Sequence, residues 1–493
     1  MAFYNGLVVF AASNPFTTGL ALAIAALVAY EAYLLFWHPL ARIPGPLVAK
    51  ISPFWLLYHC YIGDELSTLR RLHFEYGPIL RIGPYKVDIS DADAIPPLYI
   101  TQGGFIKDRC YENFAIDGHL TIFSTVDMAK RAPRVKAVMP LFSTSAIRAS
   151  TAKLYGCCDQ FIVRLKNEIS TGQPVNILNT GRSLAIDLVT THLLQHNYDG
   201  THEKELPRLS ASAFVDSIIS VGRFFYLPPE VFKALTWTIN KIVPTDHIKT
   251  SSDLMDQFID QILAVTKKGD ATYPGKLMDT NISVGELRAQ VKDLMLAGTD
   301  STGTNIGYLT RALVMDQQKL VILEKELEEN KKSANPLDIQ SLPYLSGAVK
   351  ESFRLSMASS GRLPRQMPPG GWTFKGHYFP PGVEVGCTAF VMGLDPDVFP
   401  EPEKFKPERW STPDDAHREQ MHKQFFPFGV GSRMCIARNL ATSNLHMLLE
   451  KLVESRVLVG AKMCQEELEW HEWFNVHIKG DKILLEWPEG LKC

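Results

Sequence analysis

The hydrophobic pattern changes in kind along the chain, and its first form is a nearly continuous apolar run at residues 16–37. Glu31 is the only charged residue in this run, and no Asp, Glu, Lys or Arg precedes it. The run is long enough to cross the hydrocarbon core of a bilayer, which is about 30 Å thick. A cleaved signal peptide is the alternative, but it requires a basic start and a shorter apolar core. The pattern therefore predicts a membrane-anchoring helix.

Behind this run, most apolar residues recur at intervals of three and four, which is the periodicity of amphipathic helices. Residues 283–315 form the longest such segment, and Ser283 followed by Glu286 gives it the start of a capping box. The other predicted helices cover residues 66–76, several segments within 151–268, 345–355 and 436–453. Helices therefore dominate the expected fold.

Three segments alternate between apolar and polar residues in the manner of β-hairpins. They cover residues 79–89, with a turn at Gly83-Pro84, residues 372–385, with turns at Gly376 and Pro381-Gly382, and residues 473–485, with a turn at Gly480-Asp481. Since these segments are short and few, we expect a mainly α fold with a small β region.

The composition favours one large domain behind the anchor. The chain has 493 residues, of which 46% are hydrophobic and 21% charged, and it contains no Ser/Gly-rich linker, like-charge block or internal repeat. We therefore divide it into an anchor with the start of a hinge, residues 1–42, and a main domain, residues 43–493. The 51 basic and 53 acidic residues nearly cancel, which argues against nucleic acid as a partner. Eight cysteines without a Cys-x-x-Cys pair support neither a zinc site nor a disulfide scaffold.

One cysteine stands out by its position. Cys435 follows a loop that contains Pro427, Gly429 and Gly431, and it directly precedes the apolar periodicity of residues 436–453. A thiol at a helix N-terminus faces unpaired amides and the positive end of the helix dipole, which favour the thiolate as a metal ligand or nucleophile. The alternative is a small buried hydrophobe, which is the commoner role of a lone cysteine.

The spacing of Phe428, Gly431, Arg433 and Cys435 resembles the heme-binding loop of the cytochrome P450 family. The resemblance implies that Cys435 ligates the heme iron and that Arg433 pairs with a heme propionate. It also implies that Phe428 shields the sulfur and that Gly431 lets backbone amides point at it. Four matches within eight positions outweigh the alternative of a buried hydrophobe. Ala437 stands where the family usually has glycine, and we expect its methyl group to shift the porphyrin slightly.

Two further arginines are assigned to the heme by the same resemblance. Arg365 resembles the strand arginine that holds a propionate, with Arg362 as the fallback. Arg131 stands where the family has an aromatic residue or histidine beside a propionate, and the basic position four residues later is occupied by Val135. Arg131 or Arg134 is expected to replace the missing pair, although each would equally suit a solvated surface.

The centre of the predicted helix 283–315, residues 297–304, reads Ala-Gly-Thr-Asp-Ser-Thr-Gly-Thr. This is a weak helix sequence, and its hydroxyl groups can bond back to carbonyls one turn earlier and bend the helix. It resembles the oxygen-activating motif of the same family. The resemblance implies that Ala297 and the adjacent glycine leave room for dioxygen, and that Asp300 with Ser301 and Thr302 delivers protons. Helix packing through small residues is the alternative.

Glu351 and Arg354 are spaced to share one face of the predicted helix 345–355. Such a pair is usually a solvated bridge of little energetic value. In the family it is buried and completed by a downstream arginine, here Arg409, and the resemblance implies a structural network beneath the heme loop.

The aperiodic segment 105–123 is either a surface loop or, by the same resemblance, the loop that roofs the substrate pocket. In the second case Phe114, Ile116, Leu120 and Phe123 are the candidate lining residues.

The chain as a whole is similar to fungal microsomal members of secondary metabolism. The resemblance implies the cytochrome P450 fold, with a long central helix over the heme and the Cys loop and its helix beneath, plus a transmembrane helix. It implies that heme b (iron protoporphyrin IX) inserts one oxygen atom of O2 into a hydrophobic small molecule such as a terpenoid, polyketide or alkaloid. No reductase domain is fused, so an NADPH-cytochrome P450 reductase is expected to supply electrons, with cytochrome b5 as an optional second donor. The alternatives are a heme-thiolate isomerase or dehydratase that needs no O2, and a non-catalytic heme sensor.

Basic residues predict the orientation of the anchor. Arg42 and Lys50 follow the apolar run and nothing basic precedes it, so the catalytic domain should stay cytoplasmic. Ile43-Pro44-Gly45-Pro46 cannot continue a helix and resembles the proline-rich hinge of microsomal members. We therefore expect a single-pass protein of the endoplasmic reticulum membrane.

Overall fold

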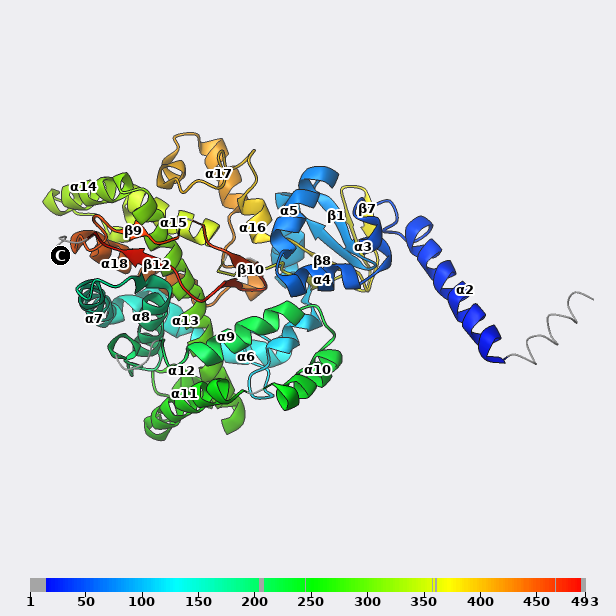
Figure 1. Ribbon diagram of the computed structural model, residues 1–493, viewed down its shortest axis with the longest axis horizontal. Helices are drawn as coiled ribbons and strands as arrows, with labels where there is room; N and C mark the ends of the chain where they lie inside the picture. The colour runs from blue at the N-terminus through cyan, green and yellow to red at the C-terminus, as the bar shows by residue number, and fades with distance from the viewer. Residues whose placement is uncertain are drawn as a thin grey trace, which may run out of the picture.

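The computed structural model describes residues 15–203, 208–243, 245–356, 358–359, 361–465 and 467–488. A large helical region and a smaller region around a β-sheet lie side by side, and helix α2 (Pro15–Phe36) projects away from the sheet side of the molecule (Figure 1). The mainly α fold with a small β region is thereby confirmed.

Helices cover every segment that the sequence predicted as helical, and they also occur where none was predicted. They are α3 (Leu47–Ile51), α4 (Phe54–Ile62), α5 (Glu65–Tyr76), α6 (Met128–Val138), α7 (Thr144–Ile169), α8 (Ile177–Leu193), α9 (Ser212–Val221), α10 (Pro229–Ile242), α11 (Asp246–Val265), α12 (Tyr273–Leu277), α13 (Val284–Met315), α14 (Gln318–Lys332), α15 (Pro343–Leu355), α16 (Ala389–Gly393), α17 (Asp415–Gln424) and α18 (Arg438–Glu454). Helix α13 crosses the middle of the helical region (Figure 1).

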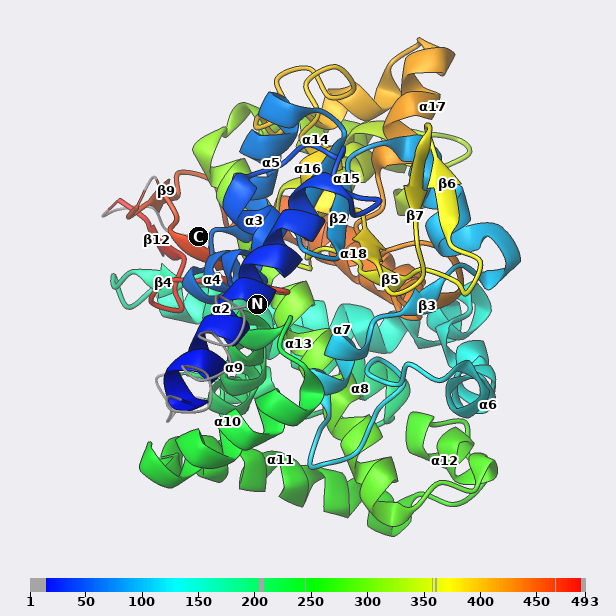
Figure 2. The same ribbon diagram turned by 90° about the vertical axis from the view of Figure 1, so that its right-hand side faces the viewer.

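The largest sheet has the strand order β1-β2-β8-β5-β3. Its strands are β1 (Ile79–Gly83), β2 (Lys86–Ile89), β8 (Glu384–Gly386), β5 (Arg365–Gln366) and β3 (Ile106–Lys107). Only the β2–β8 pair is parallel. Strands β6 (Trp372–Phe374) and β7 (His377–Phe379) form a separate hairpin. Helix α3 contacts strand β1 of the main sheet and lies close to this sheet when the molecule is seen from the anchor side (Figure 2). The predicted strands at residues 79–89 and 372–385 are therefore confirmed.

The predicted hairpin around Gly480-Asp481 is wrong. Strand β11 (Val476–Ile478) pairs with β10 (Trp470–Glu472), whereas β12 (Leu484–Glu486) pairs with β4 (Val175–Asn176) and β9 (Lys462–Met463). Gly480-Asp481 only turns the chain from one small sheet to the other. The alternation of residues 473–485 could not reveal this, because the partner strands lie outside that segment.

Helices α8 and α13 approach closely through small residues. A Cβ on Gly303 would lie 3.0 Å from the Cα of Arg182, and one on Gly298 would lie 2.8 Å from a methyl group of Val189. The alternative reading of the central motif, helix packing through small residues, is therefore correct for these two glycines. The predicted cap also forms, because the Ser283 hydroxyl accepts the Glu286 amide at 3.2 Å, although the Glu286 carboxylate turns to Arg134 instead.

The anchor helix is tied to the sheet at its C-terminal end. Within the described part of the chain, residues Phe16–Phe36 are the one helix long and apolar enough to cross a membrane, and 6% of its most apolar window is buried. The fully buried Arg81 guanidinium donates to the Leu34 carbonyl at 2.9 Å and to the Leu40 carbonyl at 3.3 Å. A Cβ on Gly45 would lie 2.2 Å from the Arg81 carbonyl oxygen, so the hinge packs directly on β1.

Candidate active site

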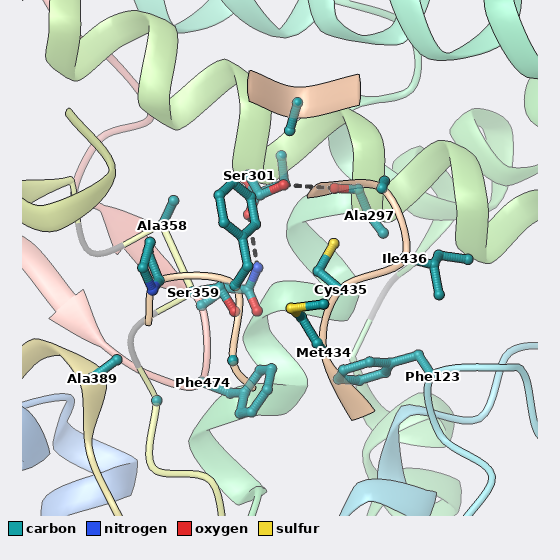
Figure 3. A pocket seen from close by; sticks show the side chains of 18 of the residues that line it. Phe123, Ala297, Ser301, Ala358, Ser359, Ala389, Met434, Cys435, Ile436 and Phe474 are labelled. Atoms are coloured by element: carbon teal, nitrogen blue, oxygen red, sulfur yellow. Dashed lines mark hydrogen bonds between the residues drawn. The ribbon is translucent and has the colours of Figure 1, made fainter. Parts of the chain in front are cut away.

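A cavity of about 350 Å³ lies between α13 and the loop that carries Cys435. The loop contributes Phe428, Arg433 and Cys435 to its lining, and α13 contributes Ala297 and Ser301. The Cys435 side chain points from the loop into the space below Ala297 and Ser301 (Figure 3). Cys435 is exposed, but its sulfur faces this internal cavity. The sequence therefore predicted correctly which two segments face each other.

The Cys435 loop is shaped by two glycines and one main-chain hydrogen bond. Gly429 and Gly431 have φ angles of +66° and +72°, a region that costs other residues strain. A Cβ on Gly431 would lie 1.7 Å from the Tyr99 carbonyl oxygen, so the loop can dock on residues Pro96–Ile100 only with glycine there. The Cys435 amide donates to the Phe428 carbonyl at 2.9 Å.

Helix α18 begins later than the sequence indicated. It starts at Arg438 with Ala437 as its N-cap, so Cys435 precedes the first turn instead of opening it. Burial raises the pKa of the Cys435 thiol, and the Ala437 amide and the Arg438 guanidinium only partly oppose this shift. The loop by itself thus disfavours the thiolate, and a bound metal cation would favour it.

Three arginines lie at the cavity and are held by main-chain carbonyls. Arg433 donates to Thr125 at 2.6 Å, Arg131 donates to Ile122 at 2.9 Å and to Ser432 at 3.2 Å, and Arg365 donates to Pro364 at 2.9 Å. All three line the cavity. In the described part of the chain no acidic side chain lies within 4.0 Å of them, whereas the buried Arg182, Arg354 and Arg362 each pair with a carboxylate.

These arginines repel one another. Burial, followed by the charges of Arg131 and Arg365, lowers the pKa of Arg433 to about 10. Hydrogen bonds to neutral carbonyls satisfy the donors but leave the charge uncompensated. The cavity thus combines apolar walls, a sulfur and a cluster of cations, which fits a flat apolar cofactor that carries carboxylates and a metal.

The alternatives that the sequence offered for this role are excluded by their contacts. Arg362 is fully buried between Asp88, whose carboxylate lies at 2.8 Å, and Glu384. Arg134 pairs with Glu286 at 2.5 Å, and Val135 packs against the main hydrophobic core.

On the opposite wall, Ser301 makes the predicted back-bond. Its hydroxyl donates to the Ala297 carbonyl at 2.8 Å (Figure 3), and the Asn305 side-chain amide donates to the Ser301 carbonyl at 2.7 Å. Thr302 also lines the cavity. The helix nevertheless continues without interruption from Val284 to Met315, so the loosened turn does not break it.

Asp300 points toward α8 and not toward the cysteine. Its carboxylate accepts a hydrogen bond from Arg182 at 2.7 Å and one from Asn475 at 3.4 Å. Burial raises the pKa of Asp300, and Arg182 opposes the shift. The sequence analysis missed both partners. Arg182 is the only Lys or Arg among residues 177–193, and this could have identified it, because an arginine is rarely buried without a partner.

Aromatic rings form one part of the cavity wall. Phe114, Phe123 and Phe474 pack in T-shaped and tilted arrangements, with ring centroids 5.3 to 5.7 Å apart. Phe114 and Phe123 line the cavity as predicted. Ile116 is part of the main core and Leu120 does not reach the cavity, so both were wrong. Phe474 was missed, because the turn between β10 and β11, rather than Gly480-Asp481, brings it to the site.

The predicted structural network beneath the loop is present. Arg354 donates two hydrogen bonds to Glu351, at 2.8 and 2.7 Å, and the Arg409 guanidinium lies 3.2 Å from the same carboxylate. Phe353 of the same helix contacts Phe428 with ring centroids 4.7 Å apart. The network therefore supports the Cys435 loop from below.

Comparisons with known proteins agree with this geometry. The family Cytochrome P450 matches residues 46–460 of the chain. The chain is 36% identical over 479 residues to cytochrome P450 monooxygenase mfmF of Annulohypoxylon moriforme, covering 92% of this chain and 96% of that protein. It is 30% identical to cytochrome P450 monooxygenase hkm5 of Aspergillus hancockii, with 91% of each chain covered. It is 27% identical to fusicoccadiene C-8 hydroxylase of Alternaria brassicicola, with 85% of each covered.

The chain therefore belongs to the cytochrome P450 family. It is an oxidoreductase of the monooxygenase class whose cofactor is a heme iron. The arginine cluster and the inward-facing sulfur described above are what such a cofactor requires.

Proposed function

We propose that this protein is a membrane-anchored monooxygenase that uses heme b to insert one oxygen atom of O2 into a hydrophobic secondary metabolite. The observation that carries the proposal is the placement of Cys435, whose sulfur faces the cavity below Ala297 and Ser301. When bound, the heme supplies the activation of dioxygen.

The residues around the cavity have separate tasks in this proposal. Cys435 is the iron ligand, and Arg433, Arg365 and Arg131 pair with the propionates. Phe428 covers the sulfur from the side of Phe353, and the glycine at position 431 keeps the loop docked on Tyr99.

The central helix handles protons. The Ser301 hydroxyl, which donates to the Ala297 carbonyl at 2.8 Å, can rotate toward the cavity at the cost of one hydrogen bond, about 1 kcal/mol. Asp300 directly precedes Ser301 and joins this turn of α13 to Arg182 through an ion pair. Thr302 adds a second hydroxyl group at the cavity. Together they provide a polar route through an apolar wall.

The substrate is a hydrophobic small molecule. Phe114, Phe123 and Phe474 give the cavity an aromatic wall, which favours flat or alicyclic apolar skeletons. The related proteins come from fungi, and one bears the name fusicoccadiene C-8 hydroxylase. We therefore favour a terpenoid, polyketide or alkaloid as substrate.

An NADPH-cytochrome P450 reductase would supply the electrons, with cytochrome b5 as an optional second donor. A second hollow lies on the other side of the Cys435 loop and is lined by Arg148, Lys350 and Arg438. A basic rim of this kind steers an acidic partner toward the loop.

The chain would sit in the endoplasmic reticulum membrane as a single-pass protein. Arg42 and Lys50 follow helix α2, which favours a cytoplasmic catalytic domain. We keep the division into an anchor at residues 1–42 and a heme-thiolate monooxygenase domain at residues 43–493.

The test is turnover of microsomes that contain the protein and its reductase, with candidate metabolites and isotopically labelled dioxygen. The proposal expects NADPH-dependent formation of a product that carries one labelled oxygen atom. A product formed without NADPH or O2 would identify the alternative, a heme-thiolate isomerase or dehydratase. A reductase-supported protein that consumes no oxygen would be a heme sensor.

A further inference from the structure

Lys107 is a buried lysine in the cavity wall that makes no direct ion pair with a described residue, although the charge of Asp293, which also lines the cavity, acts on it at longer range. Its residue is 6% exposed, and within the described ranges no carboxylate oxygen lies within 4.0 Å of its ammonium group, as the ion pairs of the other buried lysine, Lys292, show by contrast. The Lys107 ammonium donates to the Phe123 carbonyl at 2.6 Å and lies 3.6 Å from the centroid of the Tyr111 ring. A carbonyl and a π face solvate a cation, but neither neutralises it.

Lys107 also stands directly opposite another cation. It is the register partner of Arg365 across strands β3 and β5, so both side chains leave the sheet on the same face, and both line the cavity. Like charges in directly opposed positions destabilise a strand pair. Burial and the charges of Arg365, Arg433 and Arg131 lower the pKa of Lys107 well below its usual value. The fold therefore brings four cations to one side of the cavity.

We propose that Lys107 is a fourth basic residue of the cofactor site and that it pairs with a carboxylate of the heme. It replaces the basic residue that the chain lacks at position 135, where Val135 packs into the core. An anion between Lys107 and Arg365 turns the repulsion across β3 and β5 into two charge-assisted contacts. This role adds a residue of strand β3 to the site, beside Arg365 of strand β5.

A carboxylate could also be presented by a substrate. The heme is the more consistent source, because the repulsion within the cluster has to be relieved in every folded molecule and not only in those that hold substrate. Arg131, Arg365 and Arg433, which repel Lys107, are the same residues that the cofactor requires.

The experiment compares the heme-loaded wild type with Lys107→Met, Lys107→Arg and the control Lys136→Met, which removes an exposed lysine from helix α6. The rate of heme transfer to excess apomyoglobin is followed by the Soret band. We expect Lys107→Met to release heme about tenfold faster, as the loss of one charged hydrogen bond predicts. Lys107→Arg should stay within about twofold of wild type, and Lys136→Met should match it.

A second measurement separates charge from packing. Removal of a positive charge beside the heme should make the iron reduction potential of Lys107→Met more negative, whereas Lys107→Arg should retain the wild-type potential. If the methionine variant does not accumulate as folded protein, Lys107→Gln replaces it, with the same expected changes in heme transfer rate and reduction potential.

Three outcomes would overturn the proposal. The first is an unchanged heme transfer rate and potential in Lys107→Met. The second is an equal loss in the methionine and arginine variants, which would show that Lys107 acts through packing. The third is normal heme retention together with lost binding of laurate, used as a carboxylate probe and followed by its shift of the Soret band, which would assign Lys107 to substrate instead.

Discussion

Two buried groups of charges flank the Cys435 loop, and they are built in opposite ways. In the network below the loop, the Glu351 carboxylate accepts hydrogen bonds from Arg354 and from the Trp410 indole at 3.0 Å, and it lies 3.2 Å from Arg409. In the cavity above the loop, Arg131, Arg365 and Arg433 donate to main-chain carbonyls. The cations of the first group contact a carboxylate directly, whereas in the described part of the chain none of the three cavity arginines has a carboxylate within 4.0 Å.

This difference separates charges that hold the fold from charges that hold a ligand. A buried cation with an acidic partner requires nothing else, and the loss of that partner is costly. A cluster of buried cations without an acidic partner is unfavourable by itself and becomes stable only when an anion binds. We therefore expect mutations in the lower network to act on the protein with or without heme, and mutations in the cavity cluster to act on the heme-bound protein.

The largest effect is expected for Glu351→Leu, which leaves Arg354 and Arg409 buried without a partner. The free energy of unfolding should fall by about 3–5 kcal/mol, and by the same amount in the apoprotein and the heme-bound protein. Urea unfolding followed by circular dichroism measures both. The matched control is Glu329→Gln, which breaks the exposed pair with Lys325 and should cost less than about 1 kcal/mol. Equal stability of Glu351→Leu and wild type would contradict the assigned structural role.

Glu65 is a buried carboxyl group outside the cavity that makes no direct ion pair within the described residues. It is buried and bonded to the Tyr226 hydroxyl at 2.5 Å, and burial raises its pKa from 4.5 to about 7. The folded state then binds the proton more tightly than the unfolded chain, so stability should be highest below pH 4.5 and fall as the pH rises to 7.

Glu65→Gln should remove this pH dependence, which amounts to about 3–4 kcal/mol at about 1.4 kcal/mol for each pKa unit. The measurement is the free energy of unfolding of both proteins at pH 5 and pH 8. Parallel curves for the variant and wild type would show that Glu65 is charged in the folded state at both pH values.

Arg433→Leu tests the cavity cluster, where we expect an effect on heme binding and little effect on the stability of the apoprotein. It removes a cation that is repelled by Arg131 and Arg365, so the stability of the apoprotein should change by less than about 1 kcal/mol. Heme release to apomyoglobin should become about tenfold faster, because a propionate loses a charge-assisted partner. A loss of stability of similar size in the apoprotein would place Arg433 with the structural charges instead.

The smallest effect is expected for Ser301→Ala, which changes neither charge cluster. Heme binding and stability should stay close to wild type, and the product formed per NADPH consumed should fall by about fivefold, since a proton donor is lost. Thr299→Ala is the matched control, because its hydroxyl makes the same kind of back-bond, to the Met295 carbonyl at 2.7 Å, but is fully buried away from the cavity. Equal uncoupling in both variants would remove Ser301 from the proton route.

The elements that depend on local pattern could be predicted from the sequence. The 32-residue helix α13 and the strands of residues 79–89 follow from periodicity and turn residues. The facing of Cys435 and Ser301 followed from the resemblance of their two segments to the cytochrome P450 family.

Contacts between distant segments could not be predicted in this way. The pairing of β10 with β11, which brings Phe474 to the cavity, depends on a partner strand outside the predicted hairpin. The ion pair of Asp300 with Arg182 and the position of Lys107 opposite Arg365 join residues more than 100 positions apart. The expectation of a thiolate at Cys435 considered only the helix dipole, and it left out the burial that raises the pKa of the thiol.

The ligation of iron by Cys435 is tested most directly by the absorption spectrum of the reduced protein with carbon monoxide. The wild type should show its Soret band at about 450 nm, which is typical of a thiolate ligand, and Cys435→Ala should lose that band even if it still contains heme. A Cys435→Ala protein that keeps the band at about 450 nm would contradict the assignment, since another residue would then be the ligand.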